Sequence, residues 1–175
     1  MCALQTRYFR DLDSDAWEVR AHALNELFRQ GAGVVEMLIT GAAHPRPRVR
    51  AACIALMDHL GDERCCQSLE RALRDASPLV RRHAVHAVGC QKCKPLPLPI
   101  DVVGALVERM LGDSSPRVRR VAAHQIGLQP HDPRAVEALR HVIRESRDDG
   151  LVSRARRALS EQMTHAEPCD AAGSR

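Results

Sequence analysis

Aromatic residues are scarce in this chain, which contains one Trp, one Tyr and two Phe among 175 residues. All four lie within the first 28 positions, so no aromatic side chain interleaves with the later basic residues, as base stacking on single-stranded nucleic acid requires. No apolar run approaches the length of about 18 residues that a membrane-spanning helix needs, and the N-terminus lacks the apolar stretch of a signal peptide. We therefore expect a cytoplasmic protein without a membrane partner.

Motifs for catalysis are also missing. The sequence has no glycine-rich phosphate loop, no serine in a nucleophile-elbow context and no His-Glu-x-x-His motif. With 26 basic and 22 acidic residues the formal net charge is +4, which is too small to indicate a strongly basic nucleic-acid-binding protein. These absences predict a protein that is not an enzyme and needs no cofactor.

The use of cysteine and lysine indicates the compartment and the source. Seven cysteines, an odd number, fit a reducing compartment better than a framework of disulfides. Lys92 and Lys94 are the only lysines among the 26 basic residues, and alanine is abundant, as in proteins from high-GC genomes. The composition thus favours a bacterial cytoplasmic protein.

What the chain does contain is a repeat. A valine–arginine pair begins at Val19, Val49, Val80 and Val118, and a degenerate fifth copy begins at Leu151, so the spacings are 30, 31, 38 and 33 residues. The residue four places after each anchor is small and the residue eight places after it is apolar: Ala23, Cys53, Ala84, Ala122 and Ala155, then Leu27, Met57, Val88, Ile126 and Leu159. These positions share one stripe of a helix. Helical units repeated at this period indicate a solenoid.

The boundaries of the repeated helices are marked as well. Ser77-Pro78 and Ser115-Pro116 predict an N-cap hydroxyl followed by proline at the first helical position. Second helices are expected at about 33–42, 62–74, 100–111 and 133–146, and no segment has a strand pattern. We therefore predict an all-α fold, a right-handed α-solenoid of about five helix-turn-helix repeats over residues 1–163, followed by a disordered tail over 164–175.

The repeat pattern resembles a known family. Residues 75–89 and 113–127, each with Asp, Pro, Val-Arg, Ala and a final Gly in register, resemble HEAT repeats of the bacterial phycobilisome-lyase-like type. Residues 132–139 match the opening of that family's second helix, and the resemblance extends over about residues 13–163. It implies a ladder between repeats formed by an aspartate and the arginine six residues later: Asp75 with Arg81, and Asp113 with Arg119. The first two repeats depart from this pattern, with Ser14 and His44 in place of the aspartate.

One insertion interrupts the period. The longest spacing contains about residues 90–99, with Cys90 and Cys93 in a Cys-x-x-Cys motif before a Pro-Leu-Pro-Leu-Pro run. A second thiol pair, Cys65 and Cys66, is expected on the same edge of the preceding repeat, where four thiolates could converge on zinc. The favoured interpretation is structural, with these cysteines as helix-end, loop and packing residues, and redox sensing is a further alternative.

Three functions remain open. The first is a scaffold that binds a protein, with an acidic protein as one candidate, on the surface formed by the second helices. The outward charged residues would be the contacts: Arg71, Arg74, Glu108, Arg109, Arg140, Arg144 and Arg147. The alternative is nucleic-acid binding, in which this arginine stripe and residues 154–157 contact phosphates. A weaker alternative, suggested by the repeat type alone, is a lyase-like auxiliary for a cofactor-bearing protein.

Overall fold

The computed structural model describes residues 3–93 and 98–165, and these residues form helices, turns and bends without a strand. The chain divides into two compact units, residues 1–100 and 101–175. The boundary lies at the end of the predicted insertion. The predicted disordered tail lies almost wholly outside the described residues.

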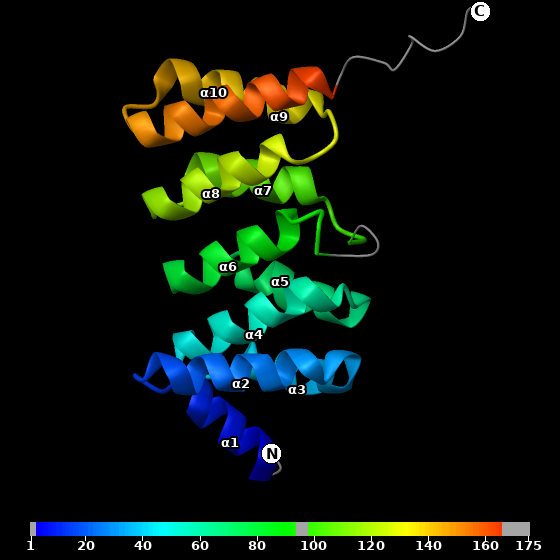
Figure 1. Ribbon diagram of the computed structural model, residues 1–175. Helices are drawn as coiled ribbons and strands as arrows, with labels where there is room; N and C mark the ends of the chain where they lie inside the picture. Colours follow the sequence, from blue (N-terminus) through cyan, green and yellow to red (C-terminus); the bar gives the residue numbers. More distant parts are fainter. Residues whose placement is uncertain (1–2, 94–97, 166–175) are drawn as a thin grey trace, which may run out of the picture. The chain divides into compact units, whose positions relative to one another are not determined.

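Unit 1 contains two helix pairs and a third anchored helix, preceded by an extra helix (Figure 1). Its elements are α1 (Ala3–Leu12), α2 (Trp17–Arg29), η1 (Gly31–Val34), α3 (Val35–Gly41), α4 (Pro47–Leu60), η2 (Glu63–Cys65), α5 (Cys66–Ala72) and α6 (Pro78–Gly89). The repeat pattern does not predict α1, because α1 carries no valine–arginine anchor. It buries Phe9 and Leu12.

Unit 2 contains four helices: α7 (Val102–Gly112), α8 (Pro116–Gly127), α9 (Pro133–Glu145) and α10 (Asp149–Thr164). Here α7 packs against α8 and α9, and α10 packs against α8 and α9. In both units the anchored helices and the second helices occur where the sequence predicts them, so the prediction of an all-α repeat fold is confirmed.

The predicted apolar stripe forms the core. At the anchor position Val49, Val80, Val118 and Leu151 are at most 3% exposed, and all five residues at the next stripe position are buried. Val19 is the exception at 40% exposed, because no anchored helix precedes α2. Stacked repeats bury their apolar face only against neighbours, so a terminal anchor is the one expected to remain exposed.

The turn before each anchored helix is built in the same way in all five copies. A side chain at the turn accepts a hydrogen bond from the backbone N–H two residues later, at 2.8–3.2 Å; the acceptors are Ser14, His44, Asp75, Asp113 and Ser146. Ser77 and Ser115 do occupy the N-cap positions, but their hydroxyls make no capping bond, so that prediction was wrong. The aspartate two residues earlier shapes the turn instead.

The arginine of the valine–arginine pair closes this turn. Its guanidinium donates to the carbonyl oxygen six residues earlier at 2.7–2.9 Å in four copies: Arg20 to Ser14, Arg50 to His44, Arg81 to Asp75 and Arg119 to Asp113. Carbonyls at the end of a helix have no partner within it, so an arginine that returns to them joins consecutive helices. This contact explains why the arginine recurs even where the aspartate is absent.

The carboxylates of these turns pair across repeats. Asp75 accepts two hydrogen bonds from Arg50 of the preceding repeat, both at 2.8 Å, whereas Arg81 donates to the main-chain carbonyl of Asp75. In unit 2 the carboxylate of Asp148, the N-cap of α10, lies 2.7 Å from Arg120 and 3.7 Å from Arg119. The acid and the arginine that pair through their side chains therefore belong to consecutive repeats.

We expect Asp75→Asn to remove an acid-sensitive part of the stability. Burial raises the pKa of Asp75, but hydrogen bonds from Arg50 and from the Ser77 N–H outweigh it, so the pKa lies below the ordinary value of 3.8. Because the folded pKa is the lower one, this contribution is present above pH 3.8 and is lost as the pH falls through the folded pKa. The variant should be about 1–3 kcal/mol less stable at neutral pH.

Urea unfolding at neutral and acidic pH tests this expectation. The difference in unfolding free energy between the wild type and Asp75→Asn should narrow in acid. Asp15→Asn is the control: its carboxylate pairs with Arg48 but is fully exposed, so the stability of this variant should stay close to that of the wild type at every pH. If the difference in unfolding free energy between the wild type and Asp75→Asn stays the same at every pH, the ion pair is not the cause of the lost stability.

Candidate functional site

Helix α9 carries the longest run of predicted contact residues. Pro133 occupies its first turn, and the Asp132 side chain caps it by accepting from the Arg134 N–H at 2.8 Å. Its inner stripe is buried: Ala135, Val136, Ala138, Leu139 and Val142. Glu137, Arg140 and Arg144 lie on the opposite, exposed side. The helix thus presents one basic face while the other holds it in the unit.

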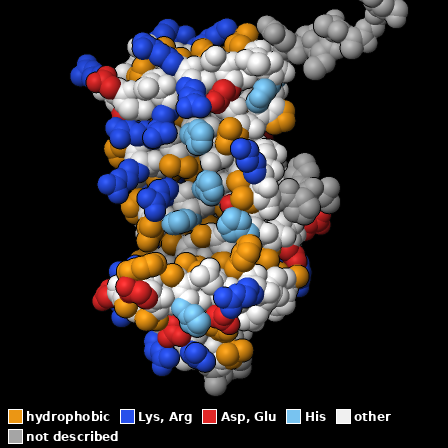
Figure 2. Space-filling model, viewed as in Figure 1, with side chains coloured by type: hydrophobic (Ala, Val, Ile, Leu, Met, Phe, Trp, Pro, Cys, Tyr) orange, Lys and Arg blue, Asp and Glu red, His pale blue; other side chains and the backbone are white. Residues whose placement is uncertain are grey.

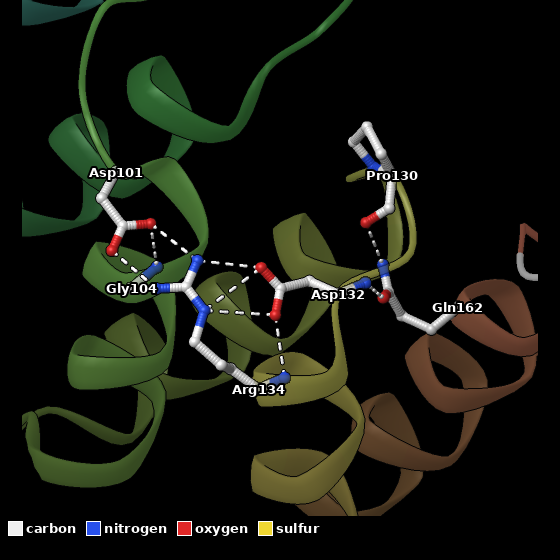
Figure 3. Close-up of polar contacts among 6 residues, drawn as sticks. All are labelled: Asp101, Gly104, Pro130, Asp132, Arg134 and Gln162. Atoms are coloured by element: carbon white, nitrogen blue, oxygen red, sulfur yellow. Dashed lines mark hydrogen bonds and ion pairs between the residues drawn. The ribbon is translucent and has the colours of Figure 1, made fainter.

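Arg134 fixes the start of α9 relative to α7 (Figure 3). Its guanidinium donates to both oxygens of Asp101, at 2.8 and 3.0 Å, and to Asp132 at 2.8 Å. The hydrogen bonds from Arg134 lower the pKa of both carboxyl groups. Asp101 also caps α7 through the Gly104 N–H, and a Cβ on Gly104 would lie 2.2 Å from the Asp101 carboxylate. The glycine is therefore needed for this cap.

Gln162 of α10 fixes the loop that leads into α9. Its side chain is fully buried and donates to the carbonyls of Ile126, Gln129 and Pro130, at 2.9, 2.8 and 3.2 Å. Its carbonyl oxygen accepts from the Asp132 N–H at 3.0 Å. Figure 3 shows Gln162 between Pro130 and Asp132. One side chain thus bonds to four backbone groups between the end of α8 and the start of α9.

A hollow of about 510 Å³ lies beside this helix, lined by His131, Pro133, Val136, Glu137, Arg140, Arg144 and Met163. Proline, valine and methionine supply apolar surface, and Met163 is 45% exposed. Two arginines and one glutamate supply the charge. A shallow apolar hollow with a basic rim suits an apolar side chain flanked by carboxylates.

The arginines at this surface are not neutralised within the chain. Among the described residues, the side chains of Arg140, Arg144 and Arg147 have no hydrogen bond or ion pair, and all three are exposed. By contrast, Arg134 and Arg157 are paired with carboxylates. The unpaired guanidinium groups beside the hollow are therefore available to a partner.

The other predicted contact residues lie elsewhere. On α7, Arg109 pairs with Glu108 and lies 3.6 Å from the buried carboxylate of Asp113, so this pair is already engaged. In unit 1, Arg71 bonds to Gln67 and lines a separate hollow of about 360 Å³ near Asp75, and Arg74 is exposed. Among the predicted contact residues, Arg140 and Arg144 line one hollow together.

The cysteines do not gather as the zinc alternative requires. The five described cysteines are free thiols: Cys53, Cys65, Cys66, Cys90 and Cys93. Burial raises the pKa of Cys53 to about 12 and that of Cys65 to about 11, as expected of thiols packed in a core. Within residues 3–93 and 98–165, Cys90 and Cys93 group with carboxylate and imidazole side chains and not with Cys65 or Cys66.

Sequence reasoning missed Arg134 and Gln162, which position the α9 surface. The N-cap aspartate of α9, Asp132, lies two residues before Arg134 and was a usable signal for the first. Gln162 lies eleven residues after its anchor, as Gln30, Gln91 and Gln129 do after theirs, so the periodicity did offer a signal for it. Its bonds to residues about 30 positions away appear only in the fold.

No helix in the described part of the chain is long and apolar enough to cross a membrane. The cytoplasmic location and the bacterial source stay predictions from the sequence.

The chain was also compared with known proteins. The family model of HEAT repeats matches residues 10–89 and 69–160. No curated protein matched the chain.

Two solved structures are similar in fold. A chain of the complex of CpcE and CpcF of phycocyanin lyase from Nostoc sp. PCC7120 is 20% identical, with 89% of this chain and 98% of that chain covered and a TM-score of 0.74. An engineered protein is 19% identical, with 92% and 80% covered and a TM-score of 0.55. At this identity the likeness concerns the fold. The family match over most of the sequence, together with the repeated helical pairs, shows that the chain belongs to the HEAT-repeat family and has an all-α HEAT-type solenoid fold.

Proposed function

We propose that this chain is a non-catalytic protein-interaction module that binds an acidic segment of a partner protein on the α9 surface of unit 2. This surface comprises Arg140, Arg144, Arg147 and the hollow beside them. The observation that carries the proposal is the set of exposed arginines without an intramolecular partner beside an apolar hollow. A HEAT-type fold and the fold's likeness to a chain from a two-protein complex support it.

The chemistry of the surface favours carboxylates. Arginine presents a rigid fork of N–H donors that pairs with a carboxylate through two hydrogen bonds. Arg140 and Arg144 are one helical turn apart, so their side chains lie on the same face of α9. The apolar lining adds contact area, and buried side chains in such hollows supply much of the affinity of an interface.

Arg144→Glu should leave stability nearly unchanged, within about 0.5 kcal/mol, since the side chain is exposed and unpaired. Partner binding should fall by about tenfold or more, because the reversal removes one ion pair and adds a repulsion. Affinity capture from native extract, with and without nuclease, followed by mass spectrometry would identify the retained protein, and titration would give the affinity. Arg156→Glu on α10, also exposed but not lining the hollow, is the matched control. Equal retention by both variants would remove the α9 surface from the proposal.

A second candidate is binding of nucleic-acid phosphates by another face of unit 2. Figure 2 shows basic side chains, all of them arginines, over α8 and α10. Arg117, Arg154 and Arg156 are exposed there and lack partners among the described residues. Phosphate contacts alone give salt-dependent, non-specific affinity. Under this alternative, nuclease treatment abolishes capture and Arg156→Glu is the damaging variant.

A further inference from the structure

Five side chains with metal-ligand atoms lie together in unit 1, where α4 and α6 end. Asp58 and His59 belong to the last turn of α4, His86 to the last turn of α6, and Cys90 and Cys93 follow α6. Ligand atoms of Asp58, His86 and Cys90 lie within 4.8 Å of one another, and so do those of Asp58, His59 and Cys93. The carboxylate of Asp58 belongs to both groups.

Asp58 is an unusual residue for its position. Its side chain is only 2% exposed, although it carries a carboxylate, and the His86 Nε2 lies 3.5 Å from Asp58 Oδ2. A buried carboxylate is costly unless a cation or hydrogen-bond donors compensate it. In a tetrahedral zinc site, neighbouring ligand atoms lie roughly 3.5 Å apart, so this oxygen and nitrogen already have the spacing of two ligands.

The backbone around the group also favours a cation. Asp58 and His86 occupy the last turns of two packed helices, and Cys90 is the C-cap of α6. The C-terminal end of a helix carries partial negative charge from its unpaired carbonyls, and two such ends meet here.

We propose that Asp58, His86 and Cys90, which form the first group, bind one Zn²⁺ together with Cys93, which shares Asp58 with the second group and moves toward the other three ligands on binding. Two thiolates, one imidazole and one carboxylate form a donor set that zinc accepts in four-coordinate sites, and the spacing of Cys-x-x-Cys lets both sulfurs reach one ion. On binding, each thiol releases its proton to solvent. His59 packs edge-on against Phe28, with ring centroids 5.5 Å apart, and is not among the four ligands.

The role of this ion is structural. Cys90 and Cys93 open the insertion that lengthens one repeat spacing to 38 residues, and both lie outside the helices. A zinc ion bound to them, to α4 and to α6 would join the start of the insertion to the repeat core. With all four positions taken by protein ligands, the site leaves no open place for a substrate.

The test is zinc binding by the purified, reduced full chain. After removal of metal with a chelator, Zn²⁺ is titrated against a chromophoric indicator, bound metal is counted by mass spectrometry, and Co²⁺ is substituted for its absorption spectrum. We expect one Zn²⁺ per chain, a higher melting temperature with zinc, and Co²⁺ spectra with the d–d bands of a tetrahedral site and a thiolate charge-transfer band.

Variants locate the site. Cys90→Ser, Cys93→Ser and His86→Gln should each lower zinc affinity by at least about 10–100-fold, the loss that removing even an outer-shell partner causes. Cys66→Ser is the matched control, since Cys66 is a partly exposed thiol of the same unit, and it should bind as the wild type does. Cys93→Ser changes a loop residue, so it keeps the test valid if a helix variant fails to fold.

Three results would overturn the proposal. The first is a wild-type chain that binds zinc no more tightly than Cys93→Ser does. The second is an equal loss of zinc affinity in Cys66→Ser and Cys90→Ser. The third is a Co²⁺ spectrum without tetrahedral or thiolate bands. None of these results bears on the α9 surface, which lies in unit 2.

Discussion

Val80→Asp should cost about 3–5 kcal/mol of the free energy of unfolding, the scale of an uncompensated buried charge. Val80 is 1% exposed at the anchor of α6, where it packs within the α4–α6 stack. A single domain is stable by only about 5–15 kcal/mol, so this variant should lose a large share of its stability.

The chain provides its own control for this substitution. Val19 occupies the same repeat position but is 40% exposed, and it lies in the first turn of α2, where an acidic residue is favourable. Val19→Asp should therefore change stability by less than about 1 kcal/mol. Urea unfolding followed by circular dichroism compares the two variants. Similar losses in both would show that the anchor position does not define the buried stripe.

Gln162→Leu should cost about 3 kcal/mol, although leucine is apolar and similar in size. The substitution removes the acceptor of the Asp132 N–H and one donor to each of three carbonyls. The Ile126 carbonyl keeps the Gln129 N–H and the Gln129 carbonyl keeps His165 Nδ1, whereas a buried polar group left unpaired costs about 1–3 kcal/mol. Water regains part of this at the exposed Pro130, so the sum is smaller than four full penalties.

The same variant should loosen the α9 surface before the whole unit unfolds. Asp132 caps α9, and Gln162 holds its N–H, so amide hydrogen exchange should accelerate first in the loop before α9 and in its opening turn. Ser160→Ala, at an exposed position of the same helix, is the control and should leave exchange unchanged. Wild-type protection in Gln162→Leu would mean that the loop is held by other contacts.

The sequence predicted what recurs and missed what occurs once. The stripe at Ala84, Ala122 and Ala155 could be predicted because every repeat packs against its neighbour in the same way. A small residue therefore recurs four places after each of the five anchors. Helix α1 carries no anchor, and its role in covering the end of the array follows only from the buried Phe9 and Leu12.

The sequence predicted only part of the contacts at the turns. The arginine of the valine–arginine pair recurs in the sequence. Its acceptors are main-chain carbonyls, which every residue type provides, so the sequence does not identify them. For this reason the side chain six residues earlier can be Ser, His or Asp. The pairing of Arg50 with Asp75 spans 25 residues and depends on how consecutive repeats stack.

The candidate sites could not be fully predicted from the sequence, because some of their residues come together only in the fold. Arg140 and Arg144 could be placed on one helix face from their spacing, but the hollow beside them includes Met163 from another helix. Cys90 and Cys93 were recognised as a possible chelating pair, whereas Asp58 and His86, from two different helices, approach them only in the fold.

The proposal that α9 binds a protein partner is tested most directly by site-specific crosslinking in cells. A photoreactive amino acid would replace Arg140 beside the hollow, and Arg156 on α10 would serve as the comparison position. We predict one discrete protein adduct at position 140, unaffected by nuclease, and no corresponding adduct at position 156. Adducts of equal yield at both positions, or adducts to nucleic acid alone, would contradict the assignment of α9 as a protein-binding surface.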